Sequence, residues 1–211
     1  MKLLNIRSID CTRPDFSLID EAVGVLKRNG VVVAPTETRY GLLAGIGRRQ
    51  PVERIYRMKK RNMSLPTAIF VRSIRDIFKM GQENNDARRL ADNFLPGPMT
   101  LILKNKSAYS APVVVDGKIG FRYSSSPVIN TILDKVDFFL TATSANISGA
   151  RESETIAEIS ALFDTAVDLY LDGGPLKELA STVIDCTGDT YKIVRSGAVS
   201  EAEIEKGMAV N

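Results

Sequence analysis

Short apolar runs alternate along this chain with segments of helical periodicity, and this alternation limits the possible folds more than any other feature. The runs at 31–34, 99–103 and 167–171 have the length and apolar content of buried strands. Strands interleaved with helices predict an α/β sheet covered by helices, and the closely spaced last strands predict some antiparallel pairing. We therefore predict a mixed sheet.

The same patterns predict the individual elements. Ser17 is the predicted N-cap of the first helix, and Gly30 follows its end. No repeat or Ser/Gly-rich linker interrupts the sequence, so residues 1–211 are predicted to form a single domain. We predict helices at 16–28, 51–60, 73–80, 84–95, 127–135 and 155–163, and strands at 31–34, 67–71, 99–103, 119–123, 138–143, 167–171, 181–186 and 191–196.

The chain contains no histidine, which restricts its chemistry. Imidazole is the usual general base near neutral pH and the commonest metal ligand. A Ser-His-Asp triad, a Cys-His pair and an HExxH zinc site are therefore excluded. Any catalysis has to use lysine, arginine, carboxylates, hydroxyls, backbone groups or a metal carried in with the substrate, and we predict no metal site of the protein's own.

The cysteines and the hydropathy bear on the compartment. Cys11 and Cys186 form no CxxC pair, which predicts reduced intracellular thiols. The longest apolar runs are shorter than the roughly 18 residues of a membrane span, and the N-terminus lacks the apolar core of a signal peptide. We predict a cytoplasmic protein without membrane contact.

Positive charge is concentrated between Arg48 and Arg61. This window holds seven basic residues against Glu53 alone, while the whole chain carries a net charge of only +3. Most such runs form a solvated helix face. The alternative is a surface for the phosphates of a nucleic acid.

Lys59 continues the apolar stripe of the helix predicted at 51–60, whose buried face is marked by Val52 and Ile55. A lysine at this position either extends its charge to solvent over a packed stem or directs it into a cleft that holds an anion. Arg61 follows just beyond the helix, where a cation also suits the negative end of the helix dipole.

Two arginines interrupt strands predicted in the second half of the chain. Alternation places Arg122 on the strand face opposite Phe121, and places Arg195 on the same face as Ile193. A single arginine of this kind usually lies at the surface or pairs with a carboxylate. Together with Lys59, these two residues favour an anion-binding site.

A segment rich in hydroxyl groups follows the strand predicted at 138–143. It reads SANISG at 144–149, and the ends of strands in α/β sheets are where ligands bind. Small hydroxyls and a glycine can present donors to a phosphate, although a turn followed by a helix cap is the alternative. Neither GxxxxGK[ST] nor GxGxxG is present, so a nucleotide would need a different cradle.

Five blocks in order resemble the Sua5/YciO/YrdC family. They are PTETRYGL at 35–42, IYRMKKR at 55–61, LPGPMT at 95–100, SANISG at 144–149, and STVID at 181–185 followed by VRSGA at 194–198. The resemblance covers nearly the whole chain. It implies a YrdC/RibB-like α/β fold in one domain, with a twisted sheet of mixed parallel and antiparallel strands, flanking helices and a basic concave cleft.

The resemblance also implies an activity. The family's best-known reaction makes threonylcarbamoyl-AMP and pyrophosphate from L-threonine, bicarbonate and ATP, for N6-threonylcarbamoyladenosine in tRNA. Mg²⁺ would arrive with ATP, and downstream threonylcarbamoyl transferase machinery would consume the product. Carried over by motif, the implied ATP-binding residues are Lys59, Arg61, Ser144, Asn146 and Arg195, of which Lys59 and Arg61 are also the implied catalytic residues; Thr36, Arg122 and Ser181 are the implied threonine or carbamate ligands.

Other functions stay open at this point. The chain departs from the family's motifs at Arg39, Asn62, Thr67 and Ser124–Ser126. One alternative is a module that binds double-stranded RNA or tRNA through the basic run, and another is a YciO-like relative with different nucleotide chemistry. The intact Lys-x-Arg and Ser-x-Asn pairs favour the synthase.

Overall fold

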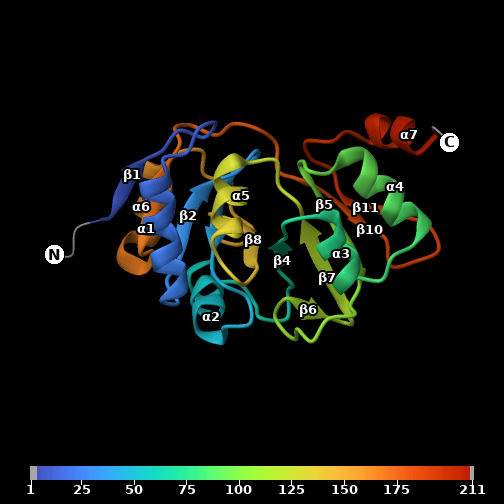
Figure 1. Ribbon diagram of the computed structural model, residues 1–211, viewed down its shortest axis with the longest axis horizontal. Coiled ribbons are helices and arrows are strands. Elements are labelled where there is room, and N and C mark those ends of the chain that lie inside the picture. The colour runs from blue at the N-terminus through green and yellow to red at the C-terminus, as the bar shows by residue number, and fades with distance from the viewer. Residues whose placement is uncertain (1–3, 210–211) are drawn as a thin grey trace.

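A long sheet crosses the molecule in the computed structural model, which describes residues 4–209 (Figure 1). Its strands are β1 Ile6–Ser8, β2 Val32–Pro35, β3 Tyr40–Leu43, β4 Ala68–Phe70, β5 Met99–Lys104, β6 Val114–Val115, β7 Lys118–Arg122, β8 Leu140–Ser144, β9 Leu169–Asp172, β10 Thr182–Asp185 and β11 Lys192–Arg195. Their order is β1-β9-β2-β3-β8-β4-β7-β5-β10-β11, and β6 pairs with β7.

The predicted mixed sheet is confirmed. Parallel pairs join β1 and β2 to β9, β4 to β7, and β5 to β10. The last two strands, β10 and β11, pair antiparallel, as their close spacing predicted. Because β10 joins β5, segments far apart in sequence form one wall on the right of Figure 1.

Helices cover the sheet at the predicted places, with one addition at the C-terminus. The N-cap of the first helix is Asp15 and not Ser17, because the Asp15 carboxylate accepts the backbone N–H of Ser17 at 2.7 Å. The helices are α1 Phe16–Lys27, α2 Arg49–Met58, α3 Ile74–Met80, α4 Asn85–Phe94, α5 Pro127–Asp134, α6 Ile156–Phe163, the 3₁₀ turn η1 Asp164–Ala166, and α7 Glu201–Ala209.

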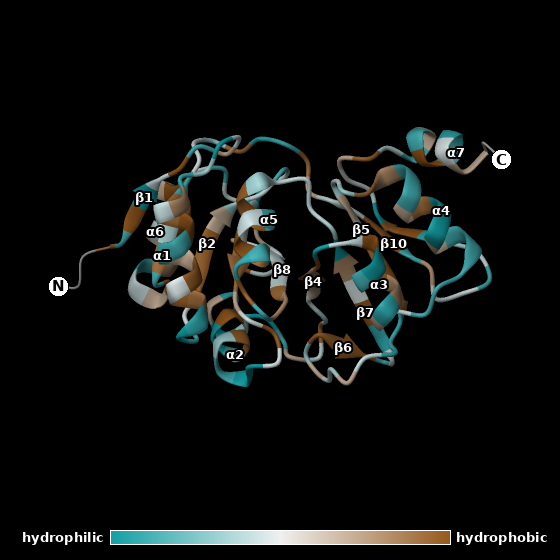
Figure 2. Ribbon diagram, in the orientation of Figure 1, coloured by the Kyte–Doolittle hydropathy of each residue, from teal (hydrophilic) through white to brown (hydrophobic). Residues whose placement is uncertain are grey.

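In the left half of the sheet, the central strands β2 and β3 are buried on both faces, whereas the edge strand β1 is exposed. In β2, Val32 and Ala34 pack toward α1 and α5, whereas Val33, together with Val31 just before the strand, packs toward α2 and α6. This explains the continuous apolar run at 31–34, since a strand covered on both sides needs no polar face. Figure 2 shows the hydrophobic colouring of β2 and β5 between helices with hydrophilic outer surfaces.

The right half of the sheet is different, because only one face packs against helices. Met99, Leu101 and Leu103 of β5 lie in the core with residues of α3 and α4. Thr100 and Ile102 point to the other face, where they line a cavity. This uncovered face positions the candidate site.

Candidate functional site

A cavity of about 650 Å³ lies against the uncovered face of β5, β7 and β10. This volume is in the range of ligand pockets. Six of the eight residues predicted for the site line it: Thr36, Arg61, Arg122, Ser144, Ser181 and Arg195. The other two, Lys59 and Asn146, lie directly behind Ser144, so the structure brings all eight residues together.

Lys59 is buried, with 2% of its surface exposed, and stands at the C-terminal end of α2. Its ammonium group donates to the backbone oxygen of Ser144, to that of Asn146 at 2.8 Å and to Asn146 Oδ1 at 3.2 Å. An ammonium has three hydrogen atoms to donate. All of them are used here, so Lys59 fixes the turn after β8. The ammonium itself does not line the cavity, and it acts on a ligand there through its electric field and through the position of the turn.

The turn after β8 is closed by side chains as well. Ser144 Oγ donates to Asn146 Oδ1 at 2.6 Å, and Asn146 Nδ2 donates to the backbone oxygen of Ala150 at 2.9 Å. The backbone N–H of Ser148 donates to the carbonyl of Lys59 at 2.9 Å. The Ser-x-Asn and Lys-x-Arg motifs are therefore one connected structure.

The burial of Lys59 alters its acidity. Desolvation, and then the nearby charge of Arg61, lower the pKa of Lys59 to about 7, while the carboxylate of Glu152 opposes this effect. An anion bound in the cavity would add negative charge and raise the pKa again. Lys59 is thus a group whose protonation can respond to ligand binding near neutral pH.

Arg122 ends β7 and lies among hydroxyl groups. Its Nη2 donates to Thr38 Oγ1, to Glu37 Oε1 at 3.0 Å and, at 3.5 Å, to Thr36 Oγ1. Ser124 donates to the other oxygen of Glu37. Alternation placed Arg122 correctly on the face opposite Phe121, but did not indicate Glu37, Thr38 or Ser124 as its surroundings.

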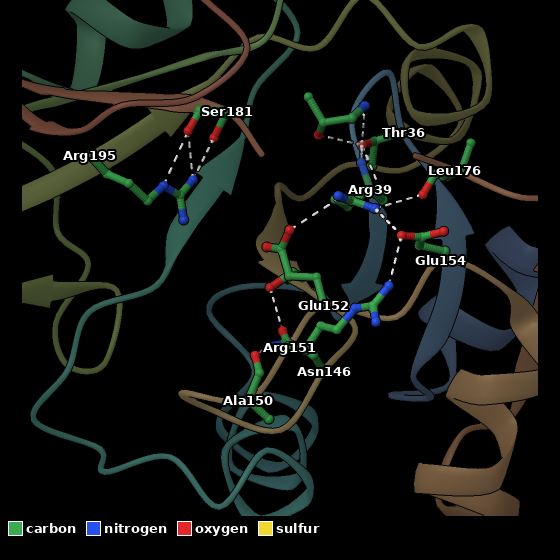
Figure 3. A network of polar contacts seen from close by, with 12 residues as sticks. Thr36, Arg39, Asn146, Ala150, Arg151, Glu152, Glu154, Leu176, Ser181 and Arg195 are labelled. Atoms are coloured by element: carbon green, nitrogen blue, oxygen red, sulfur yellow. Dashed lines mark hydrogen bonds and ion pairs between the residues drawn. The ribbon is translucent and has the colours of Figure 1, made fainter. Parts of the chain in front are cut away.

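Arg195 and Ser181 form the wall contributed by β10 and β11. Arg195 Nη2 donates to the carbonyl of Ser181 at 2.7 Å and to its hydroxyl at 3.1 Å (Figure 3). That hydroxyl is 3.0 Å from Thr100 Oγ1. Burial lowers the pKa of the Arg195 guanidinium from its ordinary value. Thr100 was missed by the sequence analysis, although a threonine inside an apolar strand was the available signal.

The predicted face of Arg195 was wrong. Ile193 pairs with Ile184 and packs on the core, whereas Arg195 pairs with Val183 and lines the cavity. A β-bulge lies between the two pairs and places Val194 as the extra residue of β11. The alternation rule fails across a bulge, so Arg195 turns from the core face to the cavity face.

Among the described residues, three arginines that line the cavity, Arg39, Arg61 and Arg122, keep a buried Nε without a hydrogen-bond acceptor, and of these atoms only Arg39 Nε has an ion-pair partner, Glu152. Within residues 4–209, the Nε atoms of Arg61 and Arg122 are buried and meet no hydrogen-bond acceptor. Arg61 Nη2 is held by the carbonyl of Pro66 at 2.7 Å, and Arg122 is 9% exposed. A buried donor without a partner costs about 1–3 kcal/mol. An anionic ligand would supply the missing acceptors.

Carboxylates also line the cavity, so the basic cleft implied by the resemblance stays a prediction. Asp185 pairs with Lys118 at 2.8 Å, and Glu152 pairs with Arg39 at 3.2 Å. Neither Glu152 nor its contact with Arg39 was indicated by the sequence, because the two residues are joined only by the fold. Among the described residues, no group of three or more acidic or cysteine side chains is placed to hold a metal ion.

Two arginines of the basic run at 48–61, Arg48 and Arg54, are engaged in contacts within the protein. Arg54 pairs with Asp168 at 2.8 Å and donates to the carbonyl of Ala166 at 2.9 Å. Arg48 donates to the carbonyl of Lys27 at 2.7 Å. A second cavity, of about 870 Å³, lies beside this run, and its lining includes Arg57, Lys60 and Arg61.

None of the helices within residues 4–209 is long and apolar enough to cross a membrane.

Comparison with protein families gives one match, over residues 24–197, to the Sua5/YciO/YrdC family described as "Telomere recombination". A proposed threonylcarbamoyl-AMP synthase of Methanocaldococcus jannaschii is 35% identical over 170 residues, which are 80% of each chain. The threonylcarbamoyl-AMP synthase of Pyrococcus abyssi is 31% identical over 189 residues, which are 88% of this chain and 55% of that protein.

Two solved structures resemble the fold closely. The crystal structure of P. abyssi Sua5 complexed with L-threonine matches with a TM-score of 0.87 and 28% identity, covering 98% of this chain and 61% of that one. The crystal structure of Escherichia coli YciO also matches with a TM-score of 0.87 and 28% identity, covering 96% and 99%. The chain therefore spans nearly all of YciO and about three fifths of Sua5.

Proposed function

The chain belongs to the Sua5/YciO/YrdC family, and on that premise we propose that it is a threonylcarbamoyl-AMP synthase. The observation that carries the proposal is a single cavity in which two arginines, Arg61 and Arg122, each keep a buried Nε donor without an acceptor among the described residues, beside hydroxyl groups. Such a cavity suits a reaction between two anionic reactants, because each needs its charge held in a fixed place.

Arg122, Thr36 and Thr38 suit the amino acid. A guanidinium is well matched to a carboxylate, and threonine hydroxyls can accept from or donate to the hydroxyl of the substrate. The P. abyssi protein crystallised with L-threonine has the same fold at 28% identity, which supports threonine as the substrate here. Ser181, on the neighbouring wall, is proposed to bind threonine or its carbamate.

The turn after β8 suits the nucleotide. Lys59 holds Ser144 and Asn146 in place, and Arg61 and Arg195 add positive charge around the same cavity. We assign ATP binding to these five residues: Arg61, Ser144 and Arg195 line the cavity, whereas Lys59 and Asn146 act through the turn that they hold. Mg²⁺ enters with ATP as part of the substrate and neutralises phosphate charge there.

The reaction can proceed without histidine. The amine of threonine adds to bicarbonate and water leaves, which gives an N-carboxylate. An oxygen of this carbamate attacks the α-phosphorus of ATP, the bond to the bridging oxygen breaks, and pyrophosphate departs with its electron pair. The protein's part is to align the reactants and to stabilise the charge on the phosphates, which lysine and arginine can do.

The product is a mixed anhydride, so it needs an acceptor. We place the protein before a threonylcarbamoyl transferase that acts on adenosine in tRNA, and in the cytoplasm, where ATP and tRNA are found.

One assay tests the proposal. Pyrophosphate release from ATP is measured with the complete mixture and with threonine or bicarbonate omitted in turn, and the adenylate is identified by mass. Release that needs both substrates is the expected result. Release without an amino acid would instead assign the chain to different, YciO-like nucleotide chemistry.

The RNA-binding alternative is supported by one observation, the second cavity beside α2. Arg57 and Lys60 both line it, and Arg57 is exposed. Cations of this kind attract a phosphodiester backbone and give salt-dependent binding. Tight, salt-dependent RNA binding without pyrophosphate release would favour this function over the synthase.

A further inference from the structure

Glu152 brings a negative charge to the cavity that the proposed function assigns to ATP. Its side chain is about one quarter exposed and lines the cavity with Ser144 and Arg195. The other lining carboxylates, Asp116 and Asp185, come from the β6–β7 turn and from β10. Glu152 instead belongs to the segment that follows the Ser-x-Asn turn.

Arg39 holds this carboxylate in place. Arg39 Nε lies 3.2 Å from Glu152 Oε2, and Arg39 Nη1 donates to the carbonyl of Leu176 at 2.8 Å. Figure 3 shows Arg39 between Glu152, Glu154 and Leu176. Glu154 is a more distant partner, at 3.9 Å, and it pairs with Arg151 at 3.3 Å. Arg39 is therefore anchored by backbone and holds Glu152 as an ion pair, without a hydrogen bond from its Nε.

The backbone on both sides of Glu152 is fixed. The carbonyl of Ala150 accepts from Asn146, and the carbonyl of Glu154 accepts from the N–H of Leu176 at 2.9 Å. Thr155 and Glu158 then form the capping box of α6. Because both flanks are held, the carboxylate can leave Arg39 mainly by turning its own side chain.

Glu152 acts on cations from both walls of the cavity. Its charge raises the pKa of Lys59 and that of Arg195, in each case against the larger effect of burial. Lys59 comes from α2 and Arg195 from β11, so the carboxylate lies within electrostatic reach of both. A polyphosphate bound by the same cations would meet a like charge there.

We propose that Glu152, positioned by Arg39, is the internal counter-ion of the polyphosphate site and determines which anions that site accepts. In the free protein its carboxylate offsets the charge of the surrounding cations. An entering anion has to compete with it, so inorganic phosphate or pyrophosphate binds weakly. A nucleoside triphosphate with Mg²⁺ is accepted, because the metal lowers its net charge and the nucleoside adds contacts. This inference rests on the proposed function, which supplies the polyphosphate site.

The test is equilibrium binding by calorimetry to the full-length protein, with E152Q as the variant and E154Q as its matched control. Glutamine keeps an acceptor oxygen for Arg39 and removes only the charge. Glu154 also contacts Arg39 but does not line the cavity. We expect E152Q to bind inorganic pyrophosphate, without Mg²⁺, about tenfold tighter than the wild type, because a like-charge contact is removed. The gain for ATP with Mg²⁺ is expected to be smaller, and E154Q to stay within about twofold of the wild type.

The outcomes separate the inference from the proposed function. Weaker or unchanged pyrophosphate binding by E152Q, or no binding by either protein, overturns the inference. An equal gain in E154Q also overturns it, since a general loss of negative charge would then be the cause. Adenylate formation is measured in parallel. If E152Q binds pyrophosphate tenfold tighter but the wild type forms no adenylate, the counter-ion role of Glu152 is supported and the synthase activity is refuted. If the wild type forms the adenylate but E152Q binds pyrophosphate no tighter, the synthase activity is supported and the counter-ion role is refuted.

Discussion

The turn fixed by Lys59 and the end of β7 that carries Arg122 are both cationic, but they use their hydrogen-bond donors differently. Lys59 gives all three hydrogen atoms to oxygens of Ser144 and Asn146. Arg122 keeps a buried Nε without an acceptor. A cation whose donors are all used builds the site, whereas a cation with a donor to spare is available to a ligand.

The two regions should therefore respond differently to substitution. Changes at Lys59 should affect the folded structure and every reactant that depends on the turn. Changes at Arg122 that keep a positive charge beside Glu37 should affect folding less and should mainly weaken the binding of one reactant.

The largest effect is expected for Lys59→Ala. Three oxygens would lose a buried donor, so we expect the free energy of unfolding to fall by about 2–4 kcal/mol and adenylate formation to fall by roughly 1,000-fold. Urea unfolding and pyrophosphate release measure the two losses. Lys60→Ala, at the exposed neighbour, is the control and should change neither by much. Normal ATP affinity and rate in Lys59→Ala would show that the turn does not depend on this lysine.

Supplying L-valine in place of the substrate L-threonine tests the hydroxyl groups around Arg122. A site that hydrogen-bonds a substrate hydroxyl rejects an analogue without it, because its own polar groups are left unpaired. We expect pyrophosphate release to fall at least about 100-fold with valine and less with serine. Equal rates with threonine and valine would contradict the assignment of Thr36, Arg122 and Ser181 to the amino acid.

Arg122→Lys tests whether the planar shape of the guanidinium at the end of β7 matters, and not only its charge. Lysine keeps the positive charge but lacks the planar fork of donors that matches a carboxylate. We expect the KM for threonine to rise by about tenfold, while the KM for ATP and the unfolding midpoint change little. A matching rise in both KM values would mean that the amino acid and the nucleotide share this side chain.

A smaller effect is expected from pH. Lys59 loses its proton at a pKa of about 7 in the folded protein, whereas an unfolded lysine titrates near about 10.4. Between these values the unfolded chain binds more protons, so stability rises with pH. As the pH rises from 7 to 9, the free energy of unfolding of the wild type should therefore increase by about 2 kcal/mol relative to that of Lys59→Met, measured by urea unfolding. A constant difference would show that the three oxygens keep the ammonium charged throughout.

The smallest effect concerns the second cavity. Because Arg54 is held by Asp168, the test for RNA uses Arg57→Ala with Lys60→Ala. We expect RNA affinity to fall several-fold with a flatter salt dependence if RNA binds there, and adenylate formation to stay unchanged. Loss of adenylate formation in the correctly folded variant would show that this cavity serves the reaction.

Periodicity predicted the parts of the site that depend on local structure. Lys59 follows from the apolar stripe of α2, and Arg122 from alternation in β7. The strand β3, at Tyr40–Leu43, was missed because it directly follows a polar turn and contains a glycine. Helix α7, at Glu201–Ala209, was missed because only Ile204 is buried in it.

Tertiary contacts decided the rest. The face of Arg195 depends on a bulge that pairing with β10 produces, and no single-strand pattern contains that information. The role of Glu152 depends on Arg39, which is brought beside it by the fold. Such pairs become visible only when the distance between two side chains is known.

The pairing of β10 with β5 also has a consequence for how the protein is made. Thr182 pairs with Met99, so β10 extends one wall of the cavity from residues that leave the ribosome long after β5. A nascent chain that ends before β10 has the Lys59 turn but lacks Ser181 and Arg195. Substrates therefore meet a complete site only after Arg195 has been synthesised, and their binding then stabilises the folded protein against unfolding.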